Sequence, residues 1–82
     1  MAHDILIVDD EADIRMLIGG ILEDDGHQTR GAAESASALR AIRARRPSLV
    51  ILDIWLQGSE LDGLQLLDVI VSEHPTLPVV VI

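Results

Sequence analysis

The sequence of 82 residues predicts an α/β protein built on a doubly wound parallel sheet. Short, purely aliphatic runs such as Ile5–Val8 and Leu49–Leu52 are typical of strands that are buried on both faces of a parallel sheet. Segments in which apolar residues recur at helical spacing lie between these runs, so that strands and helices alternate along the chain. Strand–helix–strand connections of this kind are right-handed, which places helices against the sheet.

The first strand is followed by a predicted helix that starts near Glu11 or Ala12 and has Asp10 as its cap. Gly26 is suited to the left-handed conformation that ends many helices, so we expect the helix to stop there. Its apolar residues recur every three or four positions, which is the spacing of one helix face. That face consists of Ile14, Leu17, Ile18, Ile21 and Leu22.

The middle of the chain predicts a weaker strand and a second helix. Residues 27–33 mix polar side chains with glycine and alanine, which suits a strand at the edge of the sheet. The second helix is expected over Ser35–Arg45, with Ser35 as its N-cap and Pro47 beyond its end. Its apolar face consists of Ala36, Leu39 and Ile42.

The last part of the chain predicts a long loop over residues 54–63, a third helix and a fourth strand. The Asp62-Gly63 pair is typical of a turn and helix cap, and the helix is expected to end before Pro75. Its inward residues are predicted to be Leu64, Leu67, Ile70 and Val71. Because the strand at Val79–Ile82 stops while still apolar, we expect residues 1–82 to be part of one domain, with Ile82 a cut end or the limit of what is ordered.

The composition limits the function classes. Fourteen acidic residues stand against six arginines and no lysine, for a net charge of −8, so direct contact with a nucleic-acid backbone is not expected. The chain has no cysteine, which excludes disulfides and thiolate zinc sites. No apolar run approaches the ~20 residues needed to span a bilayer, and the N-terminus lacks the features of a signal peptide. We therefore expect a cytoplasmic protein that does not contact membranes.

Acidic residues follow two of the predicted strands. Asp9 and Asp10 come directly after the first strand, and Asp53 comes directly after the third. The carboxyl ends of parallel strands meet at one edge of the sheet, where open α/β sheets bind ligands. Three carboxylates gathered there repel one another unless a cation binds or a proton is taken up. One such acid would be read as a helix cap, but three at two strand ends predict a cation site.

The same residues resemble a known family. ILIVDDE, a helix, LVILD with its last aspartate about 43 residues further on, and Asp-Gly opening the next helix resemble the receiver domain of bacterial two-component response regulators. The resemblance covers the whole chain and implies a flavodoxin-like topology, strand order 2-1-3-4-5, truncated here after the fourth strand. The WLQGSELDG stretch, with Gln57 where most receivers have proline, is similar to NtrX, a subfamily of nitrogen-related regulators with ATPase and DNA-binding domains.

The resemblance implies that Asp53 accepts a phosphoryl group from the histidine of a sensor kinase, NtrY-like in this subfamily, to control transcription. Asp10, Asp53 and the backbone carbonyl of Trp55 would bind Mg²⁺ directly, and Asp9 would act through a water molecule. The family's Thr or Ser after the fourth strand, and its Lys after the fifth, would lie beyond Ile82.

Two other function classes remain open. Because it has no lysine to neutralise a phosphoryl group, the chain could be an interaction module that is never phosphorylated. A phosphatase of the haloacid-dehalogenase type also has an aspartate nucleophile after a parallel strand, but it requires a second acid where Trp55 stands. On the receiver interpretation the chain is not an enzyme.

Several side chains receive structural interpretations. We expect the Trp55 ring to pack over its loop, and the histidines to lie on separate elements and bind no metal. The arginines Arg43, Arg45 and Arg46 are interpreted as a solvated helix end that compensates the helix dipole. The apolar strand at residues 79–82 would be an exposed edge, which predicts strand pairing, segment exchange or a homodimer.

Overall fold

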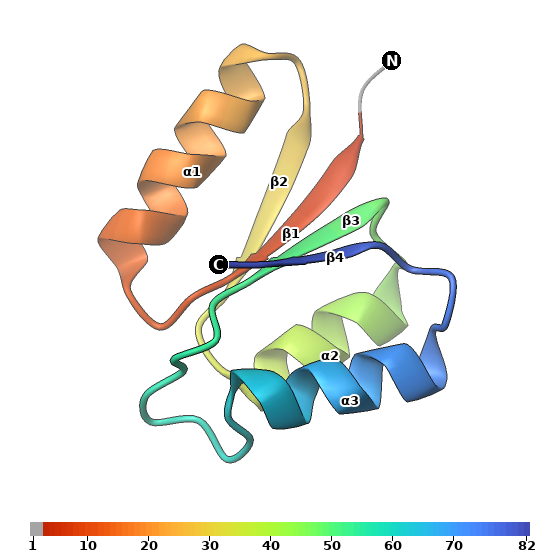
Figure 1. The fold of residues 1–82 in the computed structure, drawn as a ribbon. Helices are drawn as coiled ribbons and strands as arrows, with labels where there is room; N and C mark the ends of the chain where they lie inside the picture. Colours follow the sequence, from red (N-terminus) through yellow and green to blue (C-terminus); the bar gives the residue numbers. More distant parts are fainter. Residues whose placement is uncertain (1–2) are drawn as a thin grey trace.

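The computed structural model describes residues 3–82, which form four parallel strands and three helices in strict alternation (Figure 1). The strands are β1 (Asp4–Val8), β2 (Gln28–Ala32), β3 (Leu49–Leu52) and β4 (Val79–Val81). The helices are α1 (Ala12–Asp24), α2 (Ser35–Ala44) and α3 (Gly63–Glu73). The predicted order of elements is therefore confirmed, with boundaries that differ by one or two residues.

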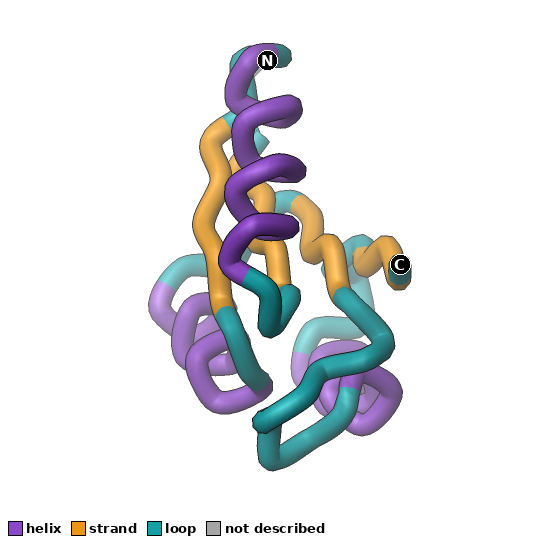
Figure 2. The backbone as a smooth tube through the Cα atoms, turned by 90° about the vertical axis from the view of Figure 1, so that its left-hand side faces the viewer, coloured by secondary structure: helices purple, strands orange, loops and turns teal. Residues whose placement is uncertain are grey.

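The sheet has the strand order β2-β1-β3-β4, so β2 lies at an edge as predicted. Helix α1 covers one face and helices α2 and α3 cover the other, which is the doubly wound arrangement (Figures 1 and 2). In the parallel register Val8 is the partner of both Ala32 and Leu52. The carboxyl ends of β1, β2 and β3 consequently lie side by side.

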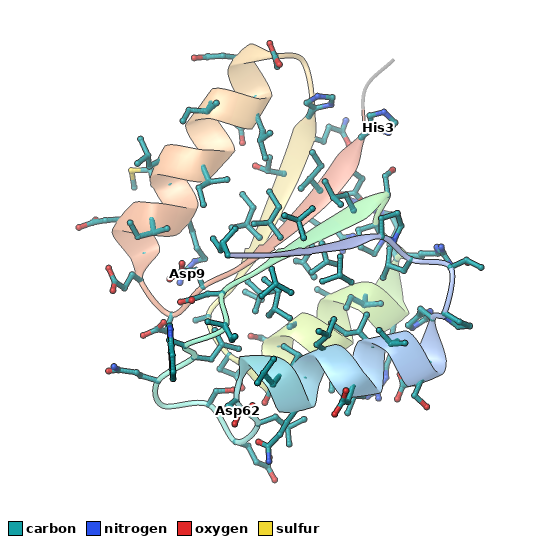
Figure 3. All side chains as sticks on the ribbon, viewed as in Figure 1. His3, Asp9 and Asp62 are labelled. Carbon is teal, nitrogen blue, oxygen red and sulfur yellow. The ribbon has the colours of Figure 1, made fainter. Side chains whose placement is uncertain are left out.

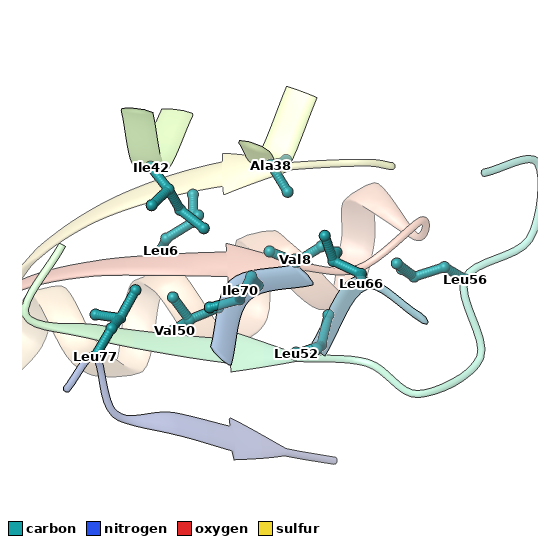
Figure 4. Close-up of a cluster of buried hydrophobic side chains, with 11 residues drawn as sticks. Leu6, Val8, Ala38, Ile42, Val50, Leu52, Leu56, Leu66, Ile70 and Leu77 are labelled. Carbon is teal, nitrogen blue, oxygen red and sulfur yellow. The ribbon is translucent and has the colours of Figure 1, made fainter. Parts of the chain in front are cut away.

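The hydrophobic core lies between the sheet and the pair α2–α3 (Figure 4). Strands β1 and β3 contribute alternate residues, and each helix contributes a stripe. The central side chains are Leu6, Val8, Val50, Leu52, Ala38, Ile42, Leu66 and Ile70. Burying each of the larger ones stabilises the fold by roughly 1.5–3 kcal/mol, which makes this layer the main source of stability.

Helix α1 packs against the sheet less fully than its apolar spacing predicted. Its only buried residue is Gly19, while Leu17 is 60% and Ile21 62% exposed, so their expected burial was wrong. A Cβ at Gly19 would lie 3.3 Å from the Thr29 hydroxyl and 3.8 Å from Ile7. The helix therefore approaches the sheet along its Gly19 side, where Ile14, Ile18 and Leu22 are partly buried, while Leu17 and Ile21 remain exposed.

Helix α3 uses a different face from the one predicted. Leu66 and Ile70 are fully buried, whereas Leu64 and Val71 are more than half exposed. The prediction for these two exposed residues was wrong because the helix is oriented by its first residue. Gly63 contacts backbone directly, and the residues three and seven positions further on share its side of the helix.

Helices α1 and α2 begin close to the predicted positions, but their capping residues differ from those predicted. Glu11, not Asp10, is the N-cap residue of α1, and its side chain makes no capping hydrogen bond. Glu34, not Ser35, caps α2 by accepting hydrogen bonds from the N–H groups of Ala36 and Ser37. The Ser37 hydroxyl and these two backbone hydrogen bonds together lower the pKa of Glu34. Ser35 is instead the first, buried residue of the helix.

Two other helix ends are as predicted. Asp62 caps α3 in a reciprocal box with Gln65, in which each side chain accepts a hydrogen bond from the other residue's backbone N–H. Gly26 follows α1 with a φ of +89°, the left-handed conformation that glycine adopts at little cost.

The arginines at the end of α2 are not merely a solvated face, which corrects the prediction. Arg43 forms an ion pair with Glu73 of α3, with 2.7 Å between nitrogen and oxygen. Arg45 and Arg30 both donate to the carboxylate of Asp4, at 3.0 and 2.9 Å. These side chains join the end of α2 to α3 and to the start of the sheet.

Asp4 is held in its ionised form by these contacts. Partial burial alone would raise the pKa of Asp4, but the hydrogen bonds and charges of Arg30 and Arg45 outweigh it and hold the pKa below its usual 3.8. The histidines lie on separate elements as expected, but the rings of His3 and His27 are neighbours, 5.4 Å apart. Within residues 3–82, no helix combines the length and apolar character that crossing a bilayer requires.

Candidate functional site

The carboxyl ends of β1 and β3 bring together the three acids that the sequence singled out. The N–H of Asp53 donates to the carbonyl of Val8 at 2.9 Å, so Asp53 continues the β1–β3 pairing one residue past its strand. Asp9, Asp10 and Asp53 each offer a carboxylate oxygen, and these oxygens lie within 4.8 Å of one another. The predicted gathering of the three carboxylates is confirmed.

Asp9, which is labelled in Figure 3, is the most buried of the three, since Asp10 and Asp53 are partly exposed and Asp9 is only 4% exposed. Its N–H donates to the Ala32 carbonyl at 3.1 Å, which extends the pairing of β1 with β2. Its carboxylate oxygen Oδ1 accepts a hydrogen bond of 2.8 Å from the N–H of Glu11, at the N-terminus of α1. Glu11 itself is exposed and lies outside the acidic group.

Asp53 is half-buried, and its own loop orients it. Its oxygen Oδ1 accepts a hydrogen bond of 3.0 Å from the N–H of Trp55, two residues further along, as in the turns that aspartate favours. The Trp55 side chain is 78% exposed, so the expected packing of its ring over the loop was wrong. The loop instead buries Leu56, which joins the core.

Gly63 fixes the start of α3 against the backbone that follows Asp53. Its N–H donates to the Ile54 carbonyl at 3.2 Å. A Cβ at Gly63 would lie 2.5 Å from the carbonyl oxygens of Asp53 and Ile54, a distance that real Cβ atoms do not adopt. Only glycine therefore permits this approach, and the sequence pattern had indicated merely a turn.

The loop between Asp53 and α3 is also tied to α2. The N–H of Ser35 donates to the Ser59 hydroxyl at 2.8 Å, and the Ser35 hydroxyl accepts from the N–H of Leu61 at 3.2 Å. The sequence did not predict that Ser35 binds the loop, because a serine at the start of a helix is usually interpreted as its N-cap. These bonds give the long loop a defined path beside the acids.

The site favours a hard divalent cation. At an effective dielectric constant of about 20, two unit charges 4.8 Å apart repel by about 3 kcal/mol. A cation placed among the carboxylates would turn this repulsion into attraction. Carboxylate oxygens without thiolate or imidazole ligands match the preference of Mg²⁺, so the residues present fit that ion.

Fold and site together define a receiver domain. Residues 5–82 match the family model described as "Response regulator receiver domain", and the chain belongs to that family. Within the family it is similar to NtrX: it is 65% identical over all 82 residues to the nitrogen assimilation regulatory protein NtrX of Azorhizobium caulinodans. It spans 18% of that relative's length.

Solved structures agree with this placement. The crystal structure of the receiver domain of NtrX from Brucella abortus superposes with a TM-score of 0.94 at 65% identity, over 95% of this chain and 65% of that one. A more distant relative is the sporulation initiation phosphotransferase F of Bacillus subtilis, 40% identical over 82% of this chain and 52% of that protein. The predicted fold class and family resemblance are thus confirmed.

Proposed function

We propose that this chain is a phosphoacceptor module in which Asp53 receives a phosphoryl group from the phosphohistidine of a sensor kinase. One observation carries the proposal: in a chain of the receiver family, three carboxylates from two adjacent strands lie within 4.8 Å of one another around Asp53. Such a cluster of like charges lowers the stability of the fold unless a cation binds or a proton is taken up, which favours a functional role over a structural one.

In the proposed reaction, an oxygen of Asp53 attacks phosphorus, a new P–O bond forms, and the P–N bond of phosphohistidine breaks with its electron pair returning to the imidazole. The N–H of Trp55 donates to Oδ1 of Asp53, whereas Oδ2 of Asp53 accepts no hydrogen bond from the described residues. The carboxylate is therefore oriented, and Oδ2 is available for attack. Catalysis of this kind is mostly positioning and charge stabilisation.

Mg²⁺ would supply the charge stabilisation, since it can bridge carboxylate and phosphoryl oxygens. Asp10, Asp53 and the backbone carbonyl of Trp55 would hold it directly, and Asp9 would hold it through a water molecule. Asp9 is buried and its Oδ1 already accepts a hydrogen bond from Glu11, which favours binding of the ion through a water molecule over direct coordination by Asp9. The chain would thus act as a switch rather than as an enzyme.

The likeness to NtrX supports the remaining parts of the proposal. The kinase would be NtrY-like, the protein would work in the cytoplasm, and phosphorylation would control transcription in nitrogen metabolism through other parts of a longer protein. A haloacid-dehalogenase-type phosphatase has no support, because Trp55 stands where its second acid is required and residues 5–82 match the receiver family.

The test is labelling by a small acyl phosphate, such as acetyl phosphate, in the presence of Mg²⁺. We expect the label on Asp53 alone, mapped by mass spectrometry, and none in Asp53→Asn. Asp68→Asn, which changes an exposed aspartate of α3, serves as the control and should be labelled like the wild type. Labelling should be slow, because the chain has no lysine to offset the phosphoryl charge.

Three outcomes would contradict the proposal. Label that persists in Asp53→Asn, or that maps to a serine or histidine, would show that another residue is the acceptor. No label after prolonged reaction, with Mg²⁺ shown to bind, would favour the alternative that this chain is an interaction module only.

A further inference from the structure

We propose that Arg15 is a positioning residue for the acidic site, although it lies on α1 and outside the carboxylate cluster. This inference rests on the proposed function, because it assigns Arg15 to the same metal and phosphoacceptor site. Arg15 Nη1 donates to the backbone carbonyl of Asp9 over 2.6 Å. Such a hydrogen bond from a charged donor is stronger than one between neutral groups.

The position of the acceptor gives this contact its importance. The Asp9 carbonyl belongs to the peptide group that joins Asp9 to Asp10, and a peptide group is planar. Holding its oxygen therefore fixes the plane between two consecutive residues whose carboxylates both belong to the cluster. The Asp9 N–H is held by Ala32 and its Oδ1 by Glu11, so Arg15 completes the fixation of this turn.

Gly31 of strand β2 makes room for the arginine. A Cβ at Gly31 would lie 3.2 Å from Cδ and 3.4 Å from Nε of Arg15, closer than side-chain atoms normally pack. Gly31 does not have a positive φ, so its backbone conformation does not require glycine. The absence of a side chain is explained by the path of Arg15, which crosses the end of β2 on its way to the acids.

Two simpler roles for Arg15 make different predictions. In the first, Arg15 only docks α1 onto β2, as does the hydrogen bond of 2.7 Å from the Thr29 hydroxyl to Glu23 further along the same helix. Alternatively, its charge alone could matter. Removing a cation from beside an acidic site would then strengthen Mg²⁺ binding, whereas loss of positioning weakens it.

The experiment measures Mg²⁺ affinity in the full chain, with calorimetry and with the fluorescence of Trp55, the only tryptophan and a neighbour of Asp53. Arg15→Met keeps an unbranched stem but has no donor. We expect it to weaken Mg²⁺ binding about tenfold, as is usual when a residue that orients metal ligands is lost. Thr29→Ala should lower the thermal midpoint and leave Mg²⁺ affinity unchanged.

Gly31→Ala provides a second, milder test that does not remove the arginine. It should weaken Mg²⁺ binding by a smaller factor in the wild-type background and have no effect on affinity in Arg15→Met, because the added methyl group acts only by displacing that side chain. If Arg15→Met does not fold, as judged by circular dichroism, Gly31→Ala carries the test with Thr29→Ala as its control.

The inference is overturned if the arginine variant binds Mg²⁺ as tightly as the wild type or more tightly, or if Thr29→Ala loses as much affinity. Unchanged Mg²⁺ affinity in Gly31→Ala would overturn the inference as well. These failures are distinct from failure of the proposed function, which is measured separately by acetyl phosphate labelling of the wild-type chain and of Asp53→Asn.

Discussion

At the scale of single residues, the acidic site shows how backbone pairing holds like charges together. Asp9 and Asp53 are bonded through their N–H groups to carbonyls of neighbouring strands, so their positions are set by the sheet and not by their side chains. The stability that the core gives to the sheet thereby offsets the electrostatic repulsion among the three carboxylates. The gathered charges favour a bound cation at this site.

Mg²⁺ should therefore stabilise this chain, and Asp10→Asn should remove most of that effect. A ligand at 100 times its dissociation constant adds about 2.7 kcal/mol to the free energy of unfolding. Without Mg²⁺, Asp10→Asn should be at least as stable as the wild type, because one repelling charge is gone. Thermal unfolding with and without Mg²⁺ measures both effects, with Asp68→Asn as the control. Equal stabilisation of the wild type and Asp10→Asn would contradict this site.

The three acids could be predicted because residue type and strand end sufficed to place them. Arg15 could not, because it binds a backbone carbonyl, and the sequence does not show which carbonyl a long side chain will reach. Gly63 was recognised as part of a turn, but its contact with the backbone at Asp53 depends on the angle at which α3 meets the sheet. Residues that act through contacts with main-chain atoms are difficult to predict, because neither composition nor sequence spacing indicates those contacts.

At the scale of elements, the strands were easier to predict than the helix faces. Short aliphatic runs indicated β1, β3 and β4, a mixed polar segment indicated the edge strand β2, and all four strands formed where expected. A helix with apolar residues on several sides can turn any of them inward, and close contacts at Gly19 and Gly63 decide which. Local competition also explains the cap of α2, since Glu34 accepts the hydrogen bonds expected of Ser35.

The ion pairs that join elements predict a dependence of stability on pH. The pKa of Asp4 is lowered in the folded chain, so its contribution is present above its unfolded pKa and is lost as the pH falls through the folded value. We expect Asp4→Asn to cost about 1 kcal/mol at pH 7 and almost nothing near pH 2. Urea unfolding across this range, with Asp68→Asn as control, measures the difference. A cost that is the same at both pH values would contradict the assignment.

At the scale of the whole molecule, apolar surface is concentrated on β4 and on α1. In β4 and the residue after it, Val80, Val81 and Ile82 are all exposed, and on α1 Met16, Leu17 and Ile21 are exposed as well. The Ile82 N–H donates to Leu52 and the Pro78 carbonyl accepts from Val50, so in this parallel strand the even-numbered residues pair with β3. Residues 79 and 81 consequently present their backbone groups outward.

We predict that a polypeptide of these 82 residues associates with itself through β4, because an unprotected apolar edge is a template for strand pairing. Val81→Pro removes an outward N–H without removing a bond to β3, and it should shift the population toward monomers in light scattering. Met16→Lys places a charge on the exposed face of α1 and should leave association unchanged. A monomeric wild type at high concentration, or association that only Met16→Lys abolishes, would contradict pairing through β4.

The contact of Gly63 with the backbone at Asp53 has a mechanical consequence. With no side chain and no gap between them, the first turn of α3 cannot advance toward residue 53 without pushing it, and residue 53 cannot shift toward the helix without tilting it. Helix α3 is 11 residues long and spans about 16 Å, and at its far end Glu73 is linked to Arg43 of α2. One end of the helix thus contacts the backbone of the acidic residue, and the other is joined to α2 by an exposed ion pair, so a movement of the backbone at residue 53 toward α3 would have to shift or tilt the helix.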